Sequence, residues 1–396
     1  MRVALMTAAL FGLATPAAAQ VRNFTLDAAK PYDGDAGFEA PGLFSVKLPP
    51  GNYRVTVTLG LPKQATDTTV KAEARRLMLD GVKVPAGRRV ERSFVVNVRN
   101  AAINPPEVNA PGATMVDLKP REKGGFTWDD RLSLEFVGPK PGVTSVKIEP
   151  VQVPTLFLLG DSTVTDQPFE PAASWGQMLT VFLKPDIAVA NHAESGESMK
   201  SFVMAKRLAK VLESVKPGDT AMIQFGHNDQ KANWPQTYAA ADTTYRSWMR
   251  VFIDEFRRRG VNVILVTSPE RRNWTADGHI RSTLADYAAA VKAVGAEEKV
   301  PVIDLNAASM RIYEALGSDR APLAFNDGGK DATHHNNYGA WVLARAVAQG
   351  LADARLPIAA HLQSDLKPFD PARPPAPETF ALAPSARTSG VRPDGN

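Results

Sequence analysis

The spacing of hydrophobic residues changes near residue 153 and divides the chain into two patterns. From Val21 to Pro150, apolar and polar residues alternate in short runs that Pro and Gly separate. These alternating runs lie at residues 43–48, 53–59, 69–74, 93–98, 132–136 and 143–148. A period of two puts one side of each strand in a core and the other side toward solvent. We therefore predict an antiparallel β-sandwich over residues 21–152.

After residue 153, short apolar runs alternate with longer segments of helical period. The apolar runs lie at residues 155–159, 187–190, 220–225, 262–266 and 301–304. The helical segments lie at residues 174–183, 201–214, 242–259, 280–298, 309–316 and 337–351. Strands that alternate with helical crossovers are typical of a parallel sheet with helices on both faces. The pattern predicts a three-layer, flavodoxin-like α/β domain over residues 153–362.

The two ends of the chain follow neither pattern. A basic start at Arg2, an apolar run over residues 3–13 and small residues up to Ala19 are typical of a secretory signal peptide. The apolar run is shorter than the roughly 20 residues that a membrane-spanning helix needs. We predict that residues 1–19 are removed after Ala19 and that the chain is exported to the periplasm or the medium. Residues 366–396 are rich in Pro, Ala, Arg and Asp and predict a disordered tail.

Composition narrows the classes of protein that the chain can represent. It has 396 residues, of which 44% are hydrophobic, which is enough for two domains with cores of their own. It has no cysteine, so neither disulfides nor thiol chemistry are available. The net charge of +4 is modest and no Lys/Arg run stands out, which argues against nucleic-acid binding and leaves attraction to an acidic polymer open. No metal or nucleotide motif appears, so no cofactor is expected, and no later segment predicts a membrane span.

Candidate chemistry gathers at the ends of the predicted strands. Ser162 follows the first apolar run directly, and the carboxyl ends of parallel strands meet along one edge of a sheet. A serine nucleophile needs a base and a group that orients the base. His334 supplies an imidazole, and Asp331 lies three residues before it. His335 is the alternative base, with Asp331 four residues before it.

The same edge offers donors for the negative charge that develops on a carbonyl oxygen. Gly196 follows the second strand and can present a bare backbone N–H, while Asn228 follows the third strand and can offer its side-chain amide. The backbone N–H of Ser162 is a third donor. Serine, base, orienting carboxylate and donors together predict acyl transfer.

Four sequence blocks carry a resemblance to a known family. The blocks are Gly160-Asp161-Ser162, Gly196, Gly226-His227-Asn228-Asp229 and Asp331-Ala332-Thr333-His334. In these blocks the chain resembles the SGNH (GDSL-type) hydrolases. Residues 224–231, 269–272 and 333–340 are similar to bacterial rhamnogalacturonan acetylesterases, and the similarity covers residues 154–353. Some members also carry a β-sandwich before the esterase domain, which we expect to be galactose-binding-like.

The resemblance implies roles for particular residues. It implies Ser162 as nucleophile, His334 as base and Asp331 as the residue that orients the base. It implies an oxyanion hole formed by the N–H of Ser162, the N–H of Gly196 and the side chain of Asn228. The chain departs from the family at Glu197, where relatives often have Arg or Gly.

Substrate recognition is predicted from the loops around these blocks. Arg271 and Arg272 follow the fourth strand and either bind galacturonate carboxylates or brace the loop. Trp234 and Trp274 are candidates for stacking on sugar rings. The leading hypothesis is an exported esterase that removes O-acetyl groups from rhamnogalacturonan. The alternatives are a general esterase or lysophospholipase-type lipase, which would need an apolar groove, a sugar-binding protein without catalysis, and a glycosidase with paired carboxylates.

Overall fold

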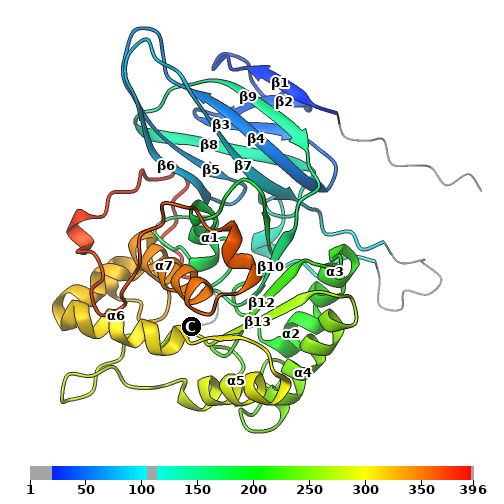
Figure 1. Ribbon diagram of the computed structural model, residues 1–396, viewed down its shortest axis with the longest axis vertical. Helices are drawn as coiled ribbons and strands as arrows, with labels where there is room; N and C mark the ends of the chain where they lie inside the picture. Colours follow the sequence, from blue (N-terminus) through cyan, green and yellow to red (C-terminus); the bar gives the residue numbers. More distant parts are fainter. Residues whose placement is uncertain (1–19, 105–113, 394–396) are drawn as a thin grey trace, which may run out of the picture.

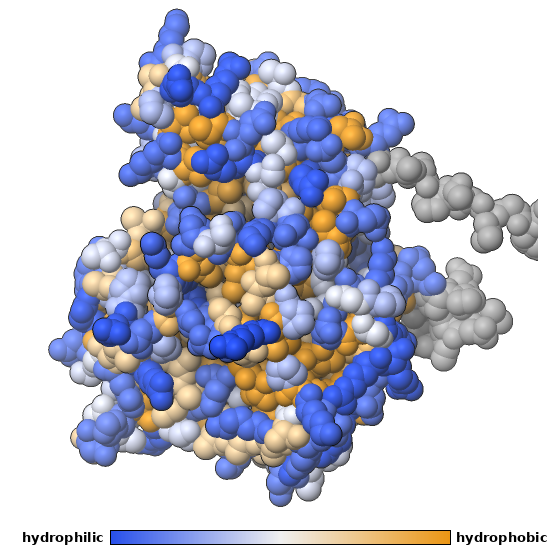
Figure 2. All heavy atoms as spheres, in the orientation of Figure 1, coloured by the Kyte–Doolittle hydropathy of each residue, from blue (hydrophilic) through white to orange (hydrophobic). Residues whose placement is uncertain are grey.

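The computed structural model describes residues 20–104 and 114–393, in which a β-sandwich is followed by an α/β domain (Figure 1). The predicted signal peptide, residues 1–19, lies outside the described residues. No helix in the described ranges is both long and apolar enough to cross a membrane. Figure 2 shows hydrophilic side chains spread over both domains on the face seen in Figure 1, with apolar residues gathered mainly on the α/β domain.

The N-terminal part is built from two antiparallel sheets. Their strands are β1 (Arg22–Thr25), β2 (Ala36–Ala40), β3 (Leu43–Lys47), β4 (Gly51–Leu59), β5 (Thr66–Ala72), β6 (Arg76–Val84), β7 (Val90–Val98), β8 (Arg131–Lys140) and β9 (Val143–Pro150). One sheet has the order β1-β9-β4-β7 and the other β2-β3-β8-β5-β6. Alternate residues of β4 are buried, including Val55 and Val57, and they share one core with Val46 and Leu132 of the other sheet. The predicted antiparallel pairing is confirmed.

The second part has a parallel sheet of five strands. They are β10 (Thr155–Gly160), β11 (Ala188–Asn191), β12 (Thr220–Gln224), β13 (Asn262–Val266) and β14 (Val302–Ile303), in the order β11-β10-β12-β13-β14. The helices are α1 (Trp175–Leu179), α2 (Met199–Met204), α3 (Arg207–Ser214), α4 (Thr244–Arg257), α5 (Ala285–Glu298), α6 (Leu305–Arg320) and α7 (Asn337–Asp353). Short 3-10 helices are η2 (Pro120–Glu122), η3 (Thr180–Phe182), η4 (Ala321–Ala324), η5 (Asp327–Gly329), η6 (Pro357–His361) and η7 (Pro377–Thr379). This strand order is the flavodoxin-like one, as predicted.

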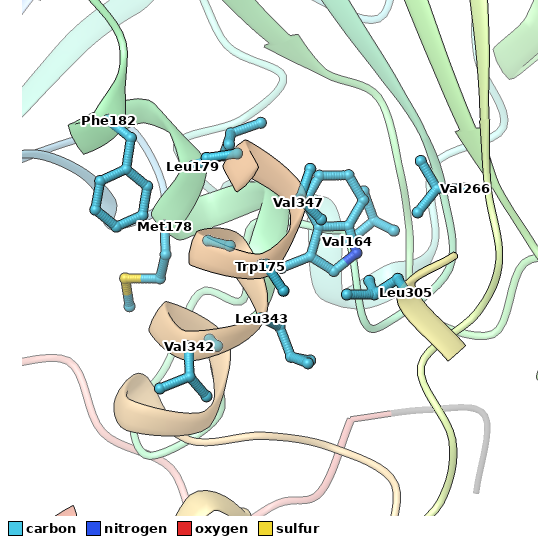
Figure 3. Close-up of a cluster of buried hydrophobic side chains, with 14 of the residues drawn as sticks. Val164, Trp175, Met178, Leu179, Phe182, Val266, Leu305, Val342, Leu343 and Val347 are labelled. Carbon is cyan, nitrogen blue, oxygen red and sulfur yellow. The ribbon is translucent and has the colours of Figure 1, made fainter. Parts of the chain in front are cut away.

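Two hydrophobic cores cover the two faces of this sheet. Successive side chains of β10 point to opposite faces, so Leu156 and Leu158 join α1, α6 and α7, while Phe157 and Leu159 join α2 to α5. Figure 3 shows the first core, in which Trp175 of α1 packs among side chains of α7, β13 and α6. Its indole Nε1 donates to Gln224 at 2.7 Å, which ties α1 to the end of β12. The three-layer prediction is confirmed.

Buried charges join the two domains at the turn between β5 and β6. Arg76 bonds Asp166 through Nε at 2.6 Å, and these side chains are 2% and 1% exposed. Arg75 donates to the carbonyl of Gln167 at 3.1 Å and pairs with Glu170 at 3.2 Å. Because Asp166, Gln167 and Glu170 lie on the loop that follows Ser162, the β-sandwich holds that loop directly.

The C-terminal segment differs from the prediction of a disordered tail. Residues 366–393 lie against both domains, and the ring of Phe380 packs on Tyr338 and Trp341 of α7 at centroid distances of 5.6 and 5.7 Å. The backbone N–H of Ser385 donates to Glu170 at 2.9 Å, and its hydroxyl donates to Glu135 of β8 at 2.5 Å. The segment is polar in composition, which is why it predicted disorder. It is ordered by the apolar contacts of Phe380 and by the hydrogen bonds that Ser385 donates to the buried carboxylates of Glu170 and Glu135.

Candidate active site

Ser162 lies at the carboxyl end of β10, on a tight turn. A Cβ at Gly160 would lie 2.5 Å from Val164 and 2.7 Å from the carbonyl of Gln224, so only glycine fits there. Asp161 is fully buried and accepts from the N–H and the hydroxyl of Thr163 at 2.9 and 2.8 Å. Its other oxygen lies 3.1 Å from Nδ1 of His227. Asp161 therefore fixes the turn and does not face a ligand.

Three side chains predicted from the sequence form one hydrogen-bonded chain. Nε2 of His334 lies 2.8 Å from Oγ of Ser162, and Nδ1 of His334 lies 2.9 Å from Oδ2 of Asp331. Oδ1 of Asp331 accepts from the backbone N–H of Thr333 at 2.8 Å and of His334 at 3.0 Å. Burial acts to raise the pKa of Asp331, but the His334 imidazole and these N–H donors outweigh burial and hold it well below its usual value. The carboxylate therefore stays ionised and orients the imidazole.

The neighbouring histidine is directed elsewhere. Nε2 of His335 lies 2.7 Å from the hydroxyl of Tyr313, and its ring packs on Phe325 at 4.6 Å. Burial lowers the pKa of His335 to about 3, so it stays neutral at ordinary pH. Of the two candidate bases, only His334 contacts Ser162.

The predicted oxyanion donors lie on three loops that side chains tie together. Gly196 has φ +79, a left-handed conformation that favours glycine. Gln167 donates to the carbonyl of Ser162 at 2.8 Å and to the hydroxyl of Ser195 at 3.2 Å, so it links the loops of Ser162 and Gly196. Nδ2 of Asn228 donates to the carbonyl of Glu197 at 2.9 Å, which leaves the second N–H of that amide for a ligand.

Arg271 and Arg272 lie behind the site and bond to its loops. Arg271 donates to the carbonyl of His227 at 3.4 Å and to Thr283 at 3.3 Å. Arg272 donates to the carbonyl of Gly329 at 2.5 Å, and its backbone N–H donates to Ala332 at 2.8 Å. Burial lowers the pKa of both guanidinium groups. These contacts match the bracing alternative, since they hold the loops that carry Asn228 and His334.

The two candidate stacking residues differ in exposure. Trp234 is 37% exposed, with the ammonium group of Lys231 4.5 Å from its ring centre. Trp274 packs against the core on the α7 side of the sheet. Among residues 20–104 and 114–393, no group of three or more His, Asp or Glu side chains is placed to hold a metal.

Gln167 and Arg75 are parts of the site that sequence reasoning missed. Gln167 contacts the Ser162 and Ser195 loops, and Arg75 of the β-sandwich holds Gln167 from behind. A single glutamine in a loop and an arginine in another domain carry no motif. Only the docked domains bring them together.

Asp229 predicts a pH dependence of stability. Its Oδ1 accepts from the N–H of Met199 at 3.1 Å, its Oδ2 is buried without a partner in the described part of the chain, and burial raises its pKa to about 8. The folded chain then keeps a proton that the unfolded chain releases, so this contribution to stability is lost as pH rises from about 4 to about 8. The Asp229→Asn variant stays neutral at every pH. We therefore expect its Tm to fall less than the Tm of the wild type as the pH rises from about 4 to about 8. A Tm difference that does not change with pH would contradict a protonated Asp229.

Comparison with known proteins agrees with this geometry. A model of the GDSL-like Lipase/Acylhydrolase family matches residues 158–342. Rhamnogalacturonan acetylesterase RhgT of Bacillus subtilis (strain 168) is 38% identical over 229 residues, which cover 54% of this chain and 96% of RhgT. The probable rhamnogalacturonan acetylesterase YesY of the same strain is 34% identical over 206 residues, which cover 51% of this chain and 94% of YesY.

A solved structure extends the likeness beyond the α/β domain. The crystal structure of YxiM from Bacillus subtilis has a TM-score of 0.51 and 27% identity, and it covers 85% of this chain and 89% of YxiM. That coverage includes the β-sandwich. The family model spans Ser162 and His334, and RhgT is matched over nearly its whole length. The chain is therefore an enzyme that belongs to the GDSL-like lipase/acylhydrolase family, the SGNH hydrolases.

Proposed function

We propose that this enzyme removes O-acetyl groups from acetylated rhamnogalacturonan by means of a Ser162–His334–Asp331 triad. The observation that carries the proposal is the chain of hydrogen bonds at 2.8 and 2.9 Å from Ser162 through His334 to Asp331. RhgT and YesY, which are named as rhamnogalacturonan acetylesterases, support the substrate class.

The triad would work in two steps. In the first, Oγ of Ser162 attacks the acetyl carbonyl while Nε2 of His334 takes the hydroxyl proton, and Asp331 stabilises the imidazolium. The tetrahedral intermediate then breaks its bond to the sugar oxygen, which receives the proton from His334. In the second step water, deprotonated by His334, attacks the acetyl group on Ser162, and acetate leaves as the serine regains its proton.

The carbonyl oxygen becomes negative in both steps and needs donors. We assign this role to the N–H of Ser162, the N–H of Gly196 and the amide of Asn228. The link that Gln167 makes between the first two loops supports this assignment, because it restrains both backbone donors before substrate binds.

Replacing Asn228 by alanine tests the third donor. We expect Asn228→Ala to lower kcat by about a hundredfold or more with little change in KM, because the donor acts mainly on the charge of the transition state. Since Asn228 also bonds the carbonyl of Glu197, the Tm of the variant must be measured alongside the rates. An unchanged kcat in a folded variant would exclude Asn228 from the oxyanion hole.

Acetate release from a panel of substrates tests the function itself. The panel contains acetylated rhamnogalacturonan, acetylated homogalacturonan, acetylated xylan and a long-chain lipid ester. We expect acetate from the polysaccharides, with the highest kcat/KM on rhamnogalacturonan. Hydrolysis of the lipid ester alone would overturn the proposal in favour of a general esterase or lysophospholipase-type lipase.

Export and the fold of the β-sandwich complete the proposal. Cleavage after Ala19 would give a mature chain that begins at Gln20, which N-terminal sequencing of the exported enzyme tests directly. A galactose-binding-like fold for the β-sandwich is supported by its two antiparallel sheets.

A further inference from the structure

A cleft of about 620 Å³ opens between the two domains, next to the loops that follow Ser162 and precede Gly196. Its walls come mainly from four segments that are distant in the sequence: residues 119–127 of the β-sandwich, residues 165–169 after Ser162, residues 194–195 before Gly196, and residues 387–393 of the C-terminal segment. The family model covers residues 158–342 and so includes two of these walls.

The cleft adjoins the active-site loops on two sides. Gln167 lines the cleft and donates to the carbonyl of Ser162. Ser195 also lines the cleft and directly precedes Gly196. On another side Arg392 lines it and donates to Asp327 at 2.7 Å, four residues before Asp331. The cleft therefore borders the loops that carry Ser162, Gly196 and Asp331.

The cleft has an excess of positive charge. Its basic side chains are Lys119, Arg121, Lys123, Arg387 and Arg392, and its acidic ones are Glu122, Asp166 and Glu194. All three carboxylates are already held in ion pairs, with Arg207, Arg76 and Arg121. Within residues 20–104 and 114–393, neither Lys123 nor Arg387 forms an ion pair within 4.0 Å, although the carboxylates of Glu135, Glu73 and Glu39 act on Arg387 from a longer distance. The cleft thus offers an ammonium and a guanidinium group to an anionic ligand.

Two aromatic rings accompany these cations. The guanidinium group of Arg387 lies 4.4 Å from the ring centre of Phe126 and donates to the carbonyl of Glu73 at 3.0 Å, so its position is fixed. Phe169 is 46% exposed on the opposite wall, although its ring is apolar. A sugar ring offers apolar C–H faces to aromatic rings, and a carboxylate on that ring can pair with a guanidinium group. This combination selects an acidic sugar over a neutral one.

We propose that the cleft binds a uronic-acid residue of the polysaccharide, next to the acetylated sugar at Ser162. The inference rests on the proposed deacetylation of carbohydrate and names the feature of the substrate that directs it. Lys123 and Arg387 bind the carboxylate, and Phe126 and Phe169 border the ring. Arg271 and Arg272 do not line this cleft, and their guanidinium groups bond to loop carbonyls elsewhere.

Binding to an inactive chain tests the cleft separately from catalysis. In full-length Ser162→Ala protein, we measure by calorimetry the Kd of a deacetylated rhamnose–galacturonate oligosaccharide and of a neutral xylo-oligosaccharide. Adding Lys123→Glu or Arg387→Met should weaken binding of the acidic oligosaccharide about tenfold, the usual value of a charge-assisted hydrogen bond. Lys63→Ala is the matched control, since Lys63 is an exposed lysine of the β-sandwich outside the cleft. Lys123 is exposed as well, so its replacement does not threaten the fold.

The active enzyme gives a second measurement. The ratio of kcat/KM on acetylated rhamnogalacturonan oligosaccharide to kcat/KM on acetylated xylo-oligosaccharide should fall about tenfold in Lys123→Glu and stay constant in Lys63→Ala. Equal losses on both substrates, or an unchanged Kd for the acidic oligosaccharide, would overturn the cleft assignment. Failure of the proposed function looks different, because the enzyme would then release no acetate from any polysaccharide while the binding result still stood.

Discussion

Ser162→Ala should lower kcat for acetyl-ester hydrolysis by about 10⁴- to 10⁶-fold, the usual cost of deleting a triad nucleophile. The change removes the Oγ that lies 2.8 Å from Nε2 of His334, and no other hydroxyl is known to contact that nitrogen in the described residues. Alanine fits the turn, because Gly160 and Asp161 determine its shape. Acetate release and p-nitrophenyl acetate hydrolysis measure the rate, and an unchanged Tm shows that the fold is kept.

The histidine variant provides the control for this result. Residues of a triad act as a unit, so the double variant Ser162→Ala/His334→Ala should be scarcely slower than Ser162→Ala alone. Additive losses would mean that His334 serves catalysis through some route other than Ser162. Near-normal turnover in Ser162→Ala would remove the nucleophile from the proposal altogether.

Arg76→Ala should lower the free energy of unfolding by about 3–5 kcal/mol, the usual cost of leaving one partner of a buried ion pair uncompensated. Asp166 is 1% exposed and, among the described residues, would keep the amide of Asn191 at 2.8 Å as its hydrogen-bond donor and only a longer-range attraction to Arg99. Arg76 also donates to the carbonyl of Val189 at 3.1 Å, so β11 loses a contact with the β-sandwich. Chemical denaturation with probes in each domain measures the change.

A double-mutant cycle separates the buried charge from the lost packing. The cycle compares Arg76→Met and Asp166→Asn with the double variant, which removes both charges and keeps much of the volume, so the double variant should lose much less stability than the two single variants together. Lys47→Ala is the surface control, because the Lys47–Asp130 pair is 58% and 55% exposed and should be worth under about 1 kcal/mol. If the double variant lost as much free energy of unfolding as the two single variants together, the uncompensated charge of Asp166 would not explain the effect.

The fold was predictable because the hydrophobic pattern of each strand and helix can be recognised from neighbouring residues in the sequence. Alternation in β4 and the apolar run of β10 depend on neighbouring residues only, and strand order follows from the crossovers. The hydrogen-bonded arrangement of Ser162, His334 and Asp331 was predictable for a related reason, since Asp331 and His334 are three residues apart and Ser162 follows the end of a strand. Lys206 shows the limit at element boundaries, because its φ of +60 divides the predicted helix 201–214 into α2 and α3.

What the sequence did not predict depends on contacts between distant segments. Arg75 and Gln167 are 92 residues apart, and nothing near either residue signals the bond between them. Arg271 and Arg272 were noticed in the sequence, but their role was not determined there, because an arginine can either bind a carboxylate or brace a loop. Only the positions of the carbonyls of His227 and Gly329 distinguish the two roles.

The C-terminal segment has a consequence for the order in which the molecule is assembled. Residues 366–393 are translated after every element that they contact. The hydrogen bonds from Ser385 to Glu135 and Glu170 can therefore form only after both domains have been synthesised. An incomplete chain that ends before this segment leaves those buried carboxylates short of donors and exposes the rings of Tyr338 and Trp341 that Phe380 covers. Such a chain would present apolar surface to proteases and chaperones. We therefore expect a chain without this segment to be degraded faster than one that has it.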